Sequence, residues 1–249
     1  MFHFFQKKLF LKDLLEGFVD IHCHILPGID DGASNITESL DLIDKLTQLG
    51  VSQFVATPHV MQDFYPNTDE TIGDAFQSLI EAVSSSSKLS NIVINPAAEY
   101  MMDEYFEDHV LNNNLFTLKK NIVLVEISYF QAPINLEDII RKIKKHGYKP
   151  VLAHPERYLY YHNNKEYYHR LKQLGCDFQL NLLSLSDYYG TNVQKKAQYL
   201  IDEKLIDFVG TDTHNLKHIE KLTNIKLSKT LYKNLEPLIQ ETNHTFSVI

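Results

Sequence analysis

The chain has 249 residues, of which 44% are hydrophobic, and carries a formal net charge of −8 at pH 7. This length and apolar content suffice for the core of one large α/β domain, so we expect a single domain over residues 1–249. The negative charge disfavours a nucleic-acid binder, because such proteins neutralise phosphates with clustered Lys and Arg. The two cysteines, Cys23 and Cys176, cannot form a disulfide framework, and we therefore expect an intracellular, cytoplasmic protein.

The first 17 residues, MFHFFQKKLFLKDLLEG, are apolar and basic. Their longest uncharged stretch is shorter than the core of a signal peptide, and no small-residue cleavage site follows. We expect residues 1–17 to form an amphipathic arm that packs on the domain or on a partner subunit, with a membrane-surface helix as the alternative. No segment approaches the roughly 20 apolar residues of a membrane span, so no transmembrane segment is expected. Packing of this arm on a partner subunit would make the protein a homo-oligomer.

From residue 18 onward, short apolar runs alternate with amphipathic segments. The predicted strands are residues 18–24, 51–59, 91–100, 121–128, 149–156, 176–184 and 207–214, and the clearest helical patterns are residues 36–50, 136–147 and 193–205. Gly50, Gly147 and Gly175 stand where helices would end. Strands that alternate with helices predict an α/β fold with a parallel sheet. Seven such units fit a barrel or a doubly wound sheet, and the positions of the polar residues favour the barrel.

The first predicted strand contains two histidines around a cysteine. Because side chains alternate along a strand, His22 and His24 would point to one side, and Ile21 and Cys23 to the other. Two converging imidazoles fill a core poorly but can hold a metal ion. Cys23 is then expected to be a small buried hydrophobic residue and no ligand.

Imidazoles and carboxylates follow at the ends of most other predicted strands. In a parallel β/α barrel the carboxyl ends of the strands meet around one axis. Six of the seven strand ends carry such residues, which gives nine candidate metal ligands: His22, His24, Asp31, His59, Glu99, Glu126, His154, Asp212 and His214.

Each of these residues also has a purely structural interpretation. A single buried histidine is usually a core residue with satisfied hydrogen bonds, and Asp30 or Asp31 could cap the following helix. Burying several unpaired carboxylates together is unfavourable, however, so cations are expected among them. Nine candidates exceed the needs of one ion and imply two or three. Imidazole and oxygen ligands without thiolate suit Mn, Fe or Zn better than Ca or Mg.

The order of these residues resembles a known family. The HxH pair, LPGIDDG, ATPH, a single Glu at the end of the third and fourth strands, AHPERY and TDTHN are similar to the PHP (polymerase and histidinol phosphatase) family. More narrowly, they resemble the CpsB/CapC type, the manganese-dependent protein tyrosine phosphatases of bacterial capsule and exopolysaccharide operons. The likeness keeps the same order from about residue 18 to about residue 215, which is most of the chain.

The resemblance implies a distorted (β/α)7 TIM-like barrel, the PHP fold, which holds three divalent ions, with manganese preferred over iron or zinc. It assigns His22, His24, Glu99 and Asp212 to one ion, Glu99, Glu126 and His154 to a second, and Asp31, His59 and His214 to the third.

Arg157 of the HPER motif matches a phosphate-binding arginine of that family. Only three of the 24 basic residues are arginine, and this one follows a candidate ligand closely, where its planar guanidinium could bind a phosphate. A surface salt bridge is the alternative role. Relatives place a second arginine a few residues past the last histidine, where this chain has Ile219. Lys217 or His218 could bind substrate there instead, although less specifically.

The resemblance further implies a phosphomonoesterase that hydrolyses phosphotyrosine on proteins. A metal-bound hydroxide would attack phosphorus while Arg157 holds the phosphoryl oxygens, and His59 or Asp212 could protonate the leaving group through water. The implied partner is a tyrosine-phosphorylated protein, the C-terminal tail of a bacterial tyrosine autokinase that controls capsule or exopolysaccharide synthesis. The alternatives are a PHP phosphatase of a small molecule such as histidinol phosphate, and a non-catalytic metal-bound scaffold.

Overall fold

The computed structural model describes residues 8–112 and 114–248. The strands are β1 (Leu9–Phe10), β2 (Phe18–Cys23), β3 (Val51–Ala56), β4 (His59–Val60), β5 (Val93–Pro96), β6 (Glu99–Met101), β7 (Ile122–Glu126), β8 (Lys149–Ala153), β9 (Asp177–Asn181), β10 (Phe208–Gly210) and β11 (Lys226–Leu227). The helices are α1 (Ile36–Gln48), α2 (Asp69–Ser85), α3 (Phe106–Asn112), α4 (Leu136–Lys145), α5 (Lys165–Gln173), α6 (Thr191–Asp202), α7 (Leu216–Thr223) and α8 (Lys229–Phe246), with short 3-10 turns at Leu11–Leu14, Pro155–Arg157, Leu159–Tyr161 and Leu182–Leu185.

Each of the seven predicted strands is present, and two of them are broken into two pieces. The second predicted strand consists of β3 and β4, and the third consists of β5 and β6. A six-stranded parallel sheet has the order β10-β9-β8-β7-β6-β4, and a three-stranded parallel sheet has the order β2-β3-β5. The expected α/β architecture is therefore confirmed, whereas the ladders of the described strands do not close into one barrel.

The two sheets approach each other at both edges. At one edge the backbone nitrogen of Asp212, just after β10, donates to the carbonyl oxygen of His22 in β2 at 2.7 Å. At the other edge β3 and β5 continue into β4 and β6 of the larger sheet, where the nitrogen of Glu99 donates to the oxygen of Pro58 at 3.0 Å. The carboxyl ends of the strands of both sheets are consequently held close together.

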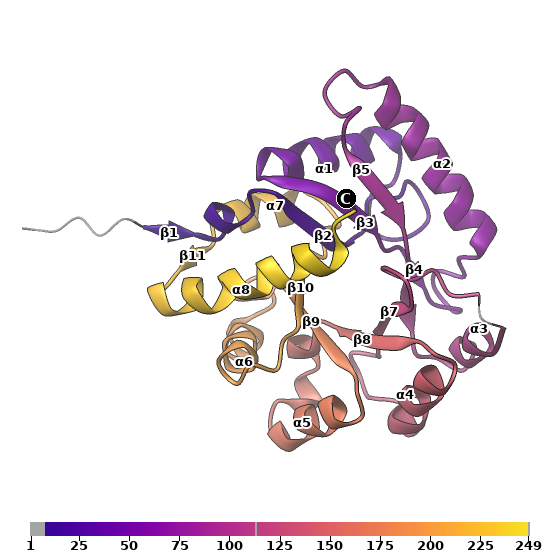
Figure 1. The fold of residues 1–249 in the computed structure, drawn as a ribbon, viewed down its shortest axis with the longest axis vertical. Helices are drawn as coiled ribbons and strands as arrows, with labels where there is room; N and C mark the ends of the chain where they lie inside the picture. The colour runs from indigo at the N-terminus through magenta and orange to yellow at the C-terminus, as the bar shows by residue number, and fades with distance from the viewer. Residues whose placement is uncertain (1–7, 113, 249) are drawn as a thin grey trace, which may run out of the picture.

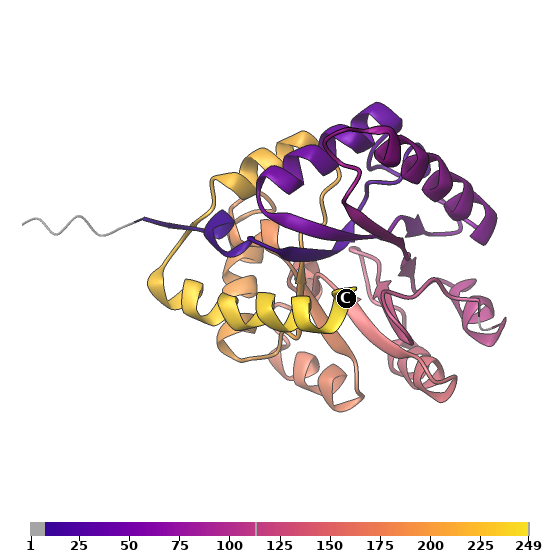
Figure 2. The same ribbon diagram turned by 45° about the horizontal axis from the view of Figure 1, so that its top comes forward.

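The helices lie on the outside of the strands, with α1 and α2 beside the three-stranded sheet and α3 to α6 around the larger one (Figure 1). The turned view shows the same arrangement (Figure 2). The first helix shows why the sequence folds this way. The side chain of Asn35 caps α1 by accepting from the nitrogen of Glu38, and Leu42 and Leu46 are buried at helical spacing. Gly50 then takes a φ of +105° and lets the chain turn into β3.

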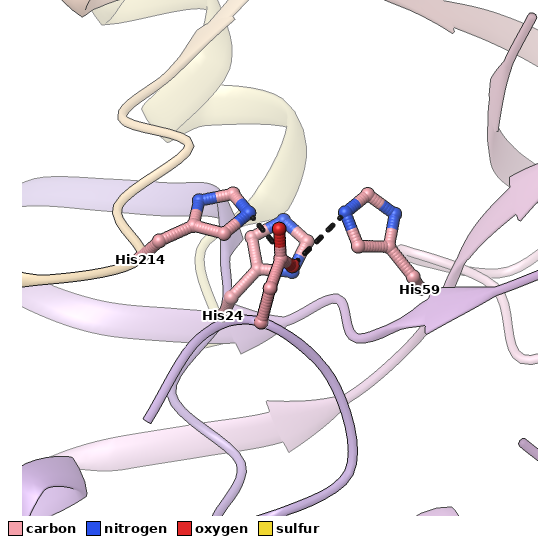
Figure 3. Close-up of side chains that lie close together, drawn as sticks. His24, His59 and His214 are labelled. Carbon is pink, nitrogen blue, oxygen red and sulfur yellow. Dashed lines mark ion pairs between the residues drawn. The ribbon is translucent and has the colours of Figure 1, made fainter. Parts of the chain in front are cut away.

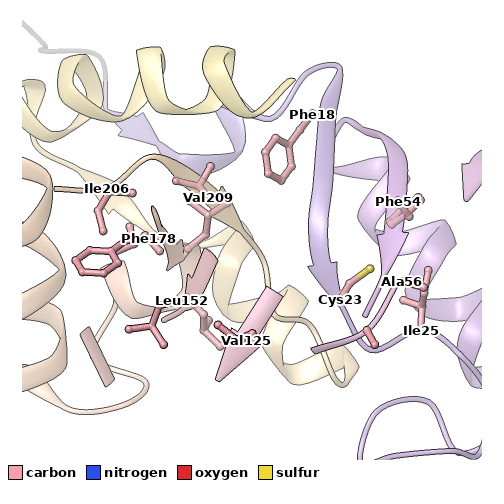
Figure 4. Close-up of a cluster of buried hydrophobic side chains, with 14 of the residues drawn as sticks. Phe18, Cys23, Ile25, Phe54, Ala56, Val125, Leu152, Phe178, Ile206 and Val209 are labelled. Carbon is pink, nitrogen blue, oxygen red and sulfur yellow. The ribbon is translucent and has the colours of Figure 1, made fainter. Parts of the chain in front are cut away.

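The buried apolar side chains form two clusters. The larger one joins strands to helices and includes Phe18 and Cys23 (Figure 4). The smaller one consists mainly of strand residues from both sheets, such as Ile21 and Val151. Ile21 and Cys23 were expected on the same face of their strand, and this expectation is wrong. The register of β2 against β3 shifts between Asp20 and Cys23, which breaks the alternation.

The segment before β2 packs on the rest of the chain. Leu9–Phe10 pair antiparallel with Lys226–Leu227, and Leu11 and Leu15 are fully buried. Residues 1–7 of the expected arm lie outside the described residues. In the described part of the chain, no helix is long and apolar enough to cross a membrane.

Candidate metal centre

The nine predicted ligands lie together at the carboxyl ends of the strands. They form four overlapping groups, each with its ligand atoms within 4.8 Å of one another: His24 with Asp31, His59 and His214; His22 with His24 and Asp212; His22 with Glu99 and His154; and His59 with Glu99 and Glu126. Every member of the predicted set belongs to at least one group. The fold thus brings residues from the first and the last units of the chain to one centre.

The deepest part of the centre combines two imidazoles with two carboxylates. The Nε2 atoms of His22 and His24 face each other at 3.3 Å. Oδ1 of Asp212 lies 3.3 Å from both nitrogens. Oε2 of Glu99 lies 3.1 Å from Nε2 of His22 and 3.5 Å from Nε2 of His24. All four side chains are buried, so their nitrogen and oxygen atoms meet in a site shielded from water.

Asp31 lies at the mouth of the centre, between two further imidazoles. Its Oδ1 is 3.5 Å from Nε2 of His59 and 3.3 Å from Nε2 of His214 (Figure 3). The ring of His24 lies behind them and stacks on the ring of His214, with 3.8 Å between the ring centroids. Three imidazoles and one half-exposed carboxylate therefore share the outer part of the centre.

Glu99 connects the inner and outer parts. Its Oε1 is 2.9 Å from Nε2 of His154, while its Oε2 is 3.2 Å from Nδ1 of His59. The same Nδ1 atom of His59 lies 2.8 Å from Oε1 of Glu126. The resemblance assigns Glu126 and His154 to one ion, but they fall in different groups, because Glu126 lies against His59.

Two residues outside the predicted set hold the far sides of the innermost imidazoles. Nδ1 of His22 is 2.8 Å from Oε1 of Gln179, and Nδ1 of His24 is 2.8 Å from Oδ2 of Asp30. Such partners fix the tautomer and the orientation of a ligand imidazole. Asp30 is therefore not a cap of α1, whose cap is Asn35. A glutamine in the middle of the apolar run 176–184 was the available sequence signal for Gln179.

The charges in the centre compensate one another. Burial alone would raise the pKa of Glu99, but the neighbouring charges of His22 and His59 hold it well below its usual range. Burial would lower the pKa of His59, but the carboxylates of Glu126 and Glu99 raise it to about 9. The carboxylate of Glu99 is therefore ionised, and positive charge beside it stabilises that form.

Several buried polar atoms of the centre lie close to one another but make no hydrogen bond of suitable geometry to the described residues. They include Oε2 of Glu99, Oε1 of Glu126 and Nδ1 of His59. Buried polar atoms normally have partners, and such atoms pointing at one another are suited to bind cations. The thiol of Cys23 belongs to none of the groups. The residues present therefore fit divalent metal ions bound by nitrogen and oxygen.

Arg157 lies at the edge of the centre rather than in a surface salt bridge. Its Nη1 donates to Oδ2 of Asp212 at 2.8 Å, and the amide of Asn181 donates to the same oxygen at 2.7 Å. Its guanidinium lies over the rings of Tyr129 and Tyr189, at 4.7 Å and 4.2 Å from their centroids. Cation–π contacts of this kind orient a guanidinium. Nothing in the sequence around the two tyrosines or Asn181 indicated these contacts.

Lys217 lines a second hollow, which borders the metal centre. Its side chain is exposed, and the same hollow is lined by Asp31 and His214, two of the predicted ligands. His218 lines the pocket above the metal centre, and its Nδ1 lies 3.3 Å from the carbonyl oxygen of Asp212. Both residues considered in place of a second arginine therefore lie beside the centre, in different hollows, and their binding of substrate stays a prediction.

The centre forms the floor of a pocket of about 680 Å³. Its lining includes Asp31, Glu126 and Arg157 and is rich in aromatic and methionine side chains. This volume is that of a typical small-molecule site, and it stands at the strand ends where such sites form in α/β proteins. The pocket can therefore bring an anionic ligand with an apolar body against the ligand candidates and Arg157.

Comparisons with known proteins identify the family of this chain. Residues 18–233 match the family described as capsular polysaccharide synthesis, CpsB/CapC. The chain is 28% identical over 200 residues to the tyrosine-protein phosphatase YwqE of Bacillus subtilis (strain 168), a match that covers 80% of this chain and 78% of that protein. It is 30% identical over 210 residues to the tyrosine-protein phosphatase CpsB of Streptococcus pneumoniae, covering 80% and 83%.

A solved structure has the same fold. It is described in work on YwqE and CpsB as metal-dependent tyrosine phosphatases, and it superimposes with a TM-score of 0.75 at 26% identity. The superposition covers 90% of this chain and 94% of the other. The family match spans most of the chain and includes all nine ligand candidates and Arg157. This protein therefore belongs to the CpsB/CapC family of capsular polysaccharide synthesis.

Proposed function

We propose that this protein is a metal-dependent protein tyrosine phosphatase that hydrolyses phosphotyrosine monoesters. The observation that carries the proposal is the convergence of nine ligand candidates on one centre, in a chain of the CpsB/CapC family. Six of the nine, together with Arg157, line one pocket. The names of the relatives and of the solved structure support the same activity.

The proposed cofactors are three divalent ions, with manganese preferred and iron or zinc as alternatives. The proposed ligands are His22, His24, Asp31, His59, Glu99, Glu126, His154, Asp212 and His214. Support comes from their overlapping groups and from a donor set of imidazole and carboxylate without thiolate. When bound, such ions lower the pKa of coordinated water and neutralise charge on the phosphoryl group.

The protein's own side chains are proposed to bind and orient the phosphate. Arg157 would hold the non-bridging oxygens, and the hydrogen bond to Asp212 together with the rings of Tyr129 and Tyr189 would keep its guanidinium directed at them. A tyrosine leaving group has a pKa near 10 and needs little protonation. His59 and Asp212 are the two residues proposed to move a proton to it through water.

We further propose that the two parallel sheets are parts of one distorted (β/α)7 barrel. Three observations support this: the seven strand units, the hydrogen bonds between the sheets at both edges, and the cluster of strand side chains that both sheets build. The barrel would constitute one domain, with residues 1–17 as an arm against it. The cellular partner of the protein is proposed to be the phosphorylated C-terminal tail of a bacterial tyrosine autokinase. The proposed location of the protein is the cytoplasm.

The test is phosphate release by the purified, manganese-loaded protein. A phosphotyrosine peptide and histidinol phosphate are compared with the wild type and with a His22→Ala/His24→Ala variant. The matched control is His169→Ala/His244→Ala, which removes two exposed histidines outside the centre. We expect hydrolysis of the peptide in preference to histidinol phosphate, lost in the first variant and kept in the second.

Other outcomes would change the assignment. A preference for histidinol phosphate would make the protein a small-molecule phosphatase of the PHP type. Absence of activity on both substrates, with metal bound as measured by inductively coupled plasma mass spectrometry, would favour a non-catalytic scaffold.

A further inference from the structure

Two phenylalanines at the pocket are the most exposed aromatic side chains of the described residues. Phe130 is 95% exposed and Phe64 is 72% exposed, and both line the pocket above the metal centre. They come from different loops, Phe130 from the loop between β7 and α4 and Phe64 from the loop between β4 and α2. A single exposed hydrophobic residue needs no explanation, but two large ones from separate loops at one pocket indicate a binding surface.

The apolar surface is continuous with the part of the pocket that would hold the phosphate. Tyr129 precedes Phe130 in the chain, and its hydroxyl lies 3.4 Å from Nε2 of His154 while its ring lies over Arg157. Neighbouring residues of one loop thus line the floor and the mouth. Pro133 of the same loop adds to the apolar lining. The loop that contacts Arg157 through Tyr129 thus also carries Phe130 into the lining of the same pocket.

The charge at the mouth has one sign. Asp63, which is exposed, and Asp103, which is partly buried, line the same pocket. No lysine is among the described lining residues, and the only arginine is Arg157 at the floor. Carboxylates at the mouth repel a second negative group on a ligand whose phosphate is already bound. The mouth thus favours apolar groups and disfavours acidic ones.

We infer that Phe64 and Phe130 form a subsite for an apolar side chain next to the phosphotyrosine of the substrate. The substrate class is then a phosphotyrosine segment with apolar neighbours and without adjacent acidic residues. This inference rests on the proposed phosphatase activity and specifies its substrate.

The test compares three phosphotyrosine peptides that differ only in the residues flanking the phosphotyrosine, which are Leu, Ser or Glu. Free phosphotyrosine serves as the reference without neighbours. With the manganese-loaded wild type, we expect kcat/KM for the Leu peptide to exceed that for the Ser peptide by about tenfold, because Phe64 and Phe130 remove part of the leucine surface from water. The Glu peptide is expected to fall below the Ser peptide.

In a Phe64→Ser/Phe130→Ser variant, the kcat/KM values for the Leu and Ser peptides are expected to lie within about twofold of each other. Both side chains are largely exposed, so their loss leaves the core intact. The matched control is Leu111→Ser, which replaces an apolar side chain that is 51% exposed and lies outside this pocket. The control is expected to keep the preference for the Leu peptide.

The results separate the subsite from the activity. Equal kcat/KM for the three peptides in the wild type, or a preference that survives in the double variant, would overturn the subsite alone. Failure to hydrolyse the peptides and free phosphotyrosine would overturn the proposed function together with the subsite. A wild-type dimer that dissociates in the double variant during analytical ultracentrifugation, without any peptide preference, would assign Phe64 and Phe130 to self-association and overturn the inference.

Discussion

Two of the proposed ligands have an unusual backbone conformation. His154 has a φ of 36° and Asp212 a φ of 51°, values that residues other than glycine seldom adopt. His154 directly follows β8, and Asp212 lies two residues after the end of β10. The side chains of both belong to the proposed metal centre. Backbone strain of this kind persists where the surrounding structure over-determines it, often at functional sites. The sequence identified the two residues by type and position, but it contained no signal of their conformation.

The contacts of Arg157 predict that lysine cannot replace it. Lysine presents a point charge, which lacks the planar donors that reach Asp212 and cannot stack in the same way between Tyr129 and Tyr189. We expect Arg157→Lys to lower kcat/KM for a phosphotyrosine peptide by about 10- to 100-fold. Steady-state kinetics would measure the change. Arg170→Lys, on the exposed side of α5, is the matched control and should retain activity.

The buried carboxyl of Glu156 predicts a change in stability with pH. Burial raises its pKa from the ordinary 4.5 to about 7. The folded state therefore holds the proton more tightly than the unfolded state, so the free energy of unfolding falls as pH rises from about 4.5 to about 7. Glu156→Gln removes this dependence of stability on pH, because glutamine does not ionise. Its side-chain oxygen can still accept a hydrogen bond from the backbone nitrogen of Asn181.

Urea unfolding at pH 5 and pH 8 measures the effect of Glu156→Gln. We expect the free energy of unfolding of the variant to rise by about 2–3 kcal/mol relative to that of the wild type when the pH is raised from 5 to 8. An equal difference between the two proteins at both pH values would contradict the prediction.

At the scale of elements, the predicted strands were found because each is a short apolar run bounded by polar or turn residues. The two breaks were not predicted. Pro58 lacks a backbone donor and stands between β3 and β4, where the chain passes from one sheet to the other. The residues at this break, Thr57-Pro58-His59, interrupt the apolar run, and the proline was the available sequence signal for it.

The close approach of β10 and β2 predicts the effect of a small substitution. A Cβ atom on Gly210 would lie 2.7 Å from Cβ of His22 and 2.9 Å from Nε2 of Gln179, closer than real contacts allow. Gly210→Ala should therefore push β10 away from His22 and the residue that orients it. We expect a loss of about 1–3 kcal/mol in the free energy of unfolding and weaker manganese binding.

Thermal unfolding and isothermal titration calorimetry with manganese would measure both effects of Gly210→Ala. Gly73→Ala in α2 is the matched control, because its added Cβ meets no atom within 4 Å. Helix propensity predicts that the control is as stable as the wild type or slightly more stable. Unchanged metal affinity in Gly210→Ala would show that β10 can shift without disturbing His22.

At the scale of the whole molecule, the proposed ligands tie together the ends of six strand units. Bound ions would therefore stabilise the folded state by mass action, because the unfolded chain does not hold the ligands together. We expect removal of metal with EDTA to lower Tm by about 5 °C or more, and manganese to restore it. Differential scanning fluorimetry would measure the shift, and His22→Ala/His24→Ala should show a much smaller one.

The same centre predicts that metal affinity falls with decreasing pH. In the ion-free protein His59 has its pKa raised to about 9 by the neighbouring carboxylates, so it must release a proton to bind a metal ion. Manganese titrations between pH 6 and pH 8.5 should therefore give a dissociation constant that decreases as pH rises. A constant value over this range would contradict the proposed role of the imidazoles.

The sequence by itself determined the α/β class, the order of the units and the nine residues at the strand ends. It could do so because a parallel strand places its carboxyl end, and the side chains that follow it, at a common edge whatever the loops contain. The ring partners Gln179 and Asp30, and the tyrosines around Arg157, were decided only by the tertiary structure. Their roles depend on distances and directions between side chains far apart in the chain, which sequence spacing does not specify.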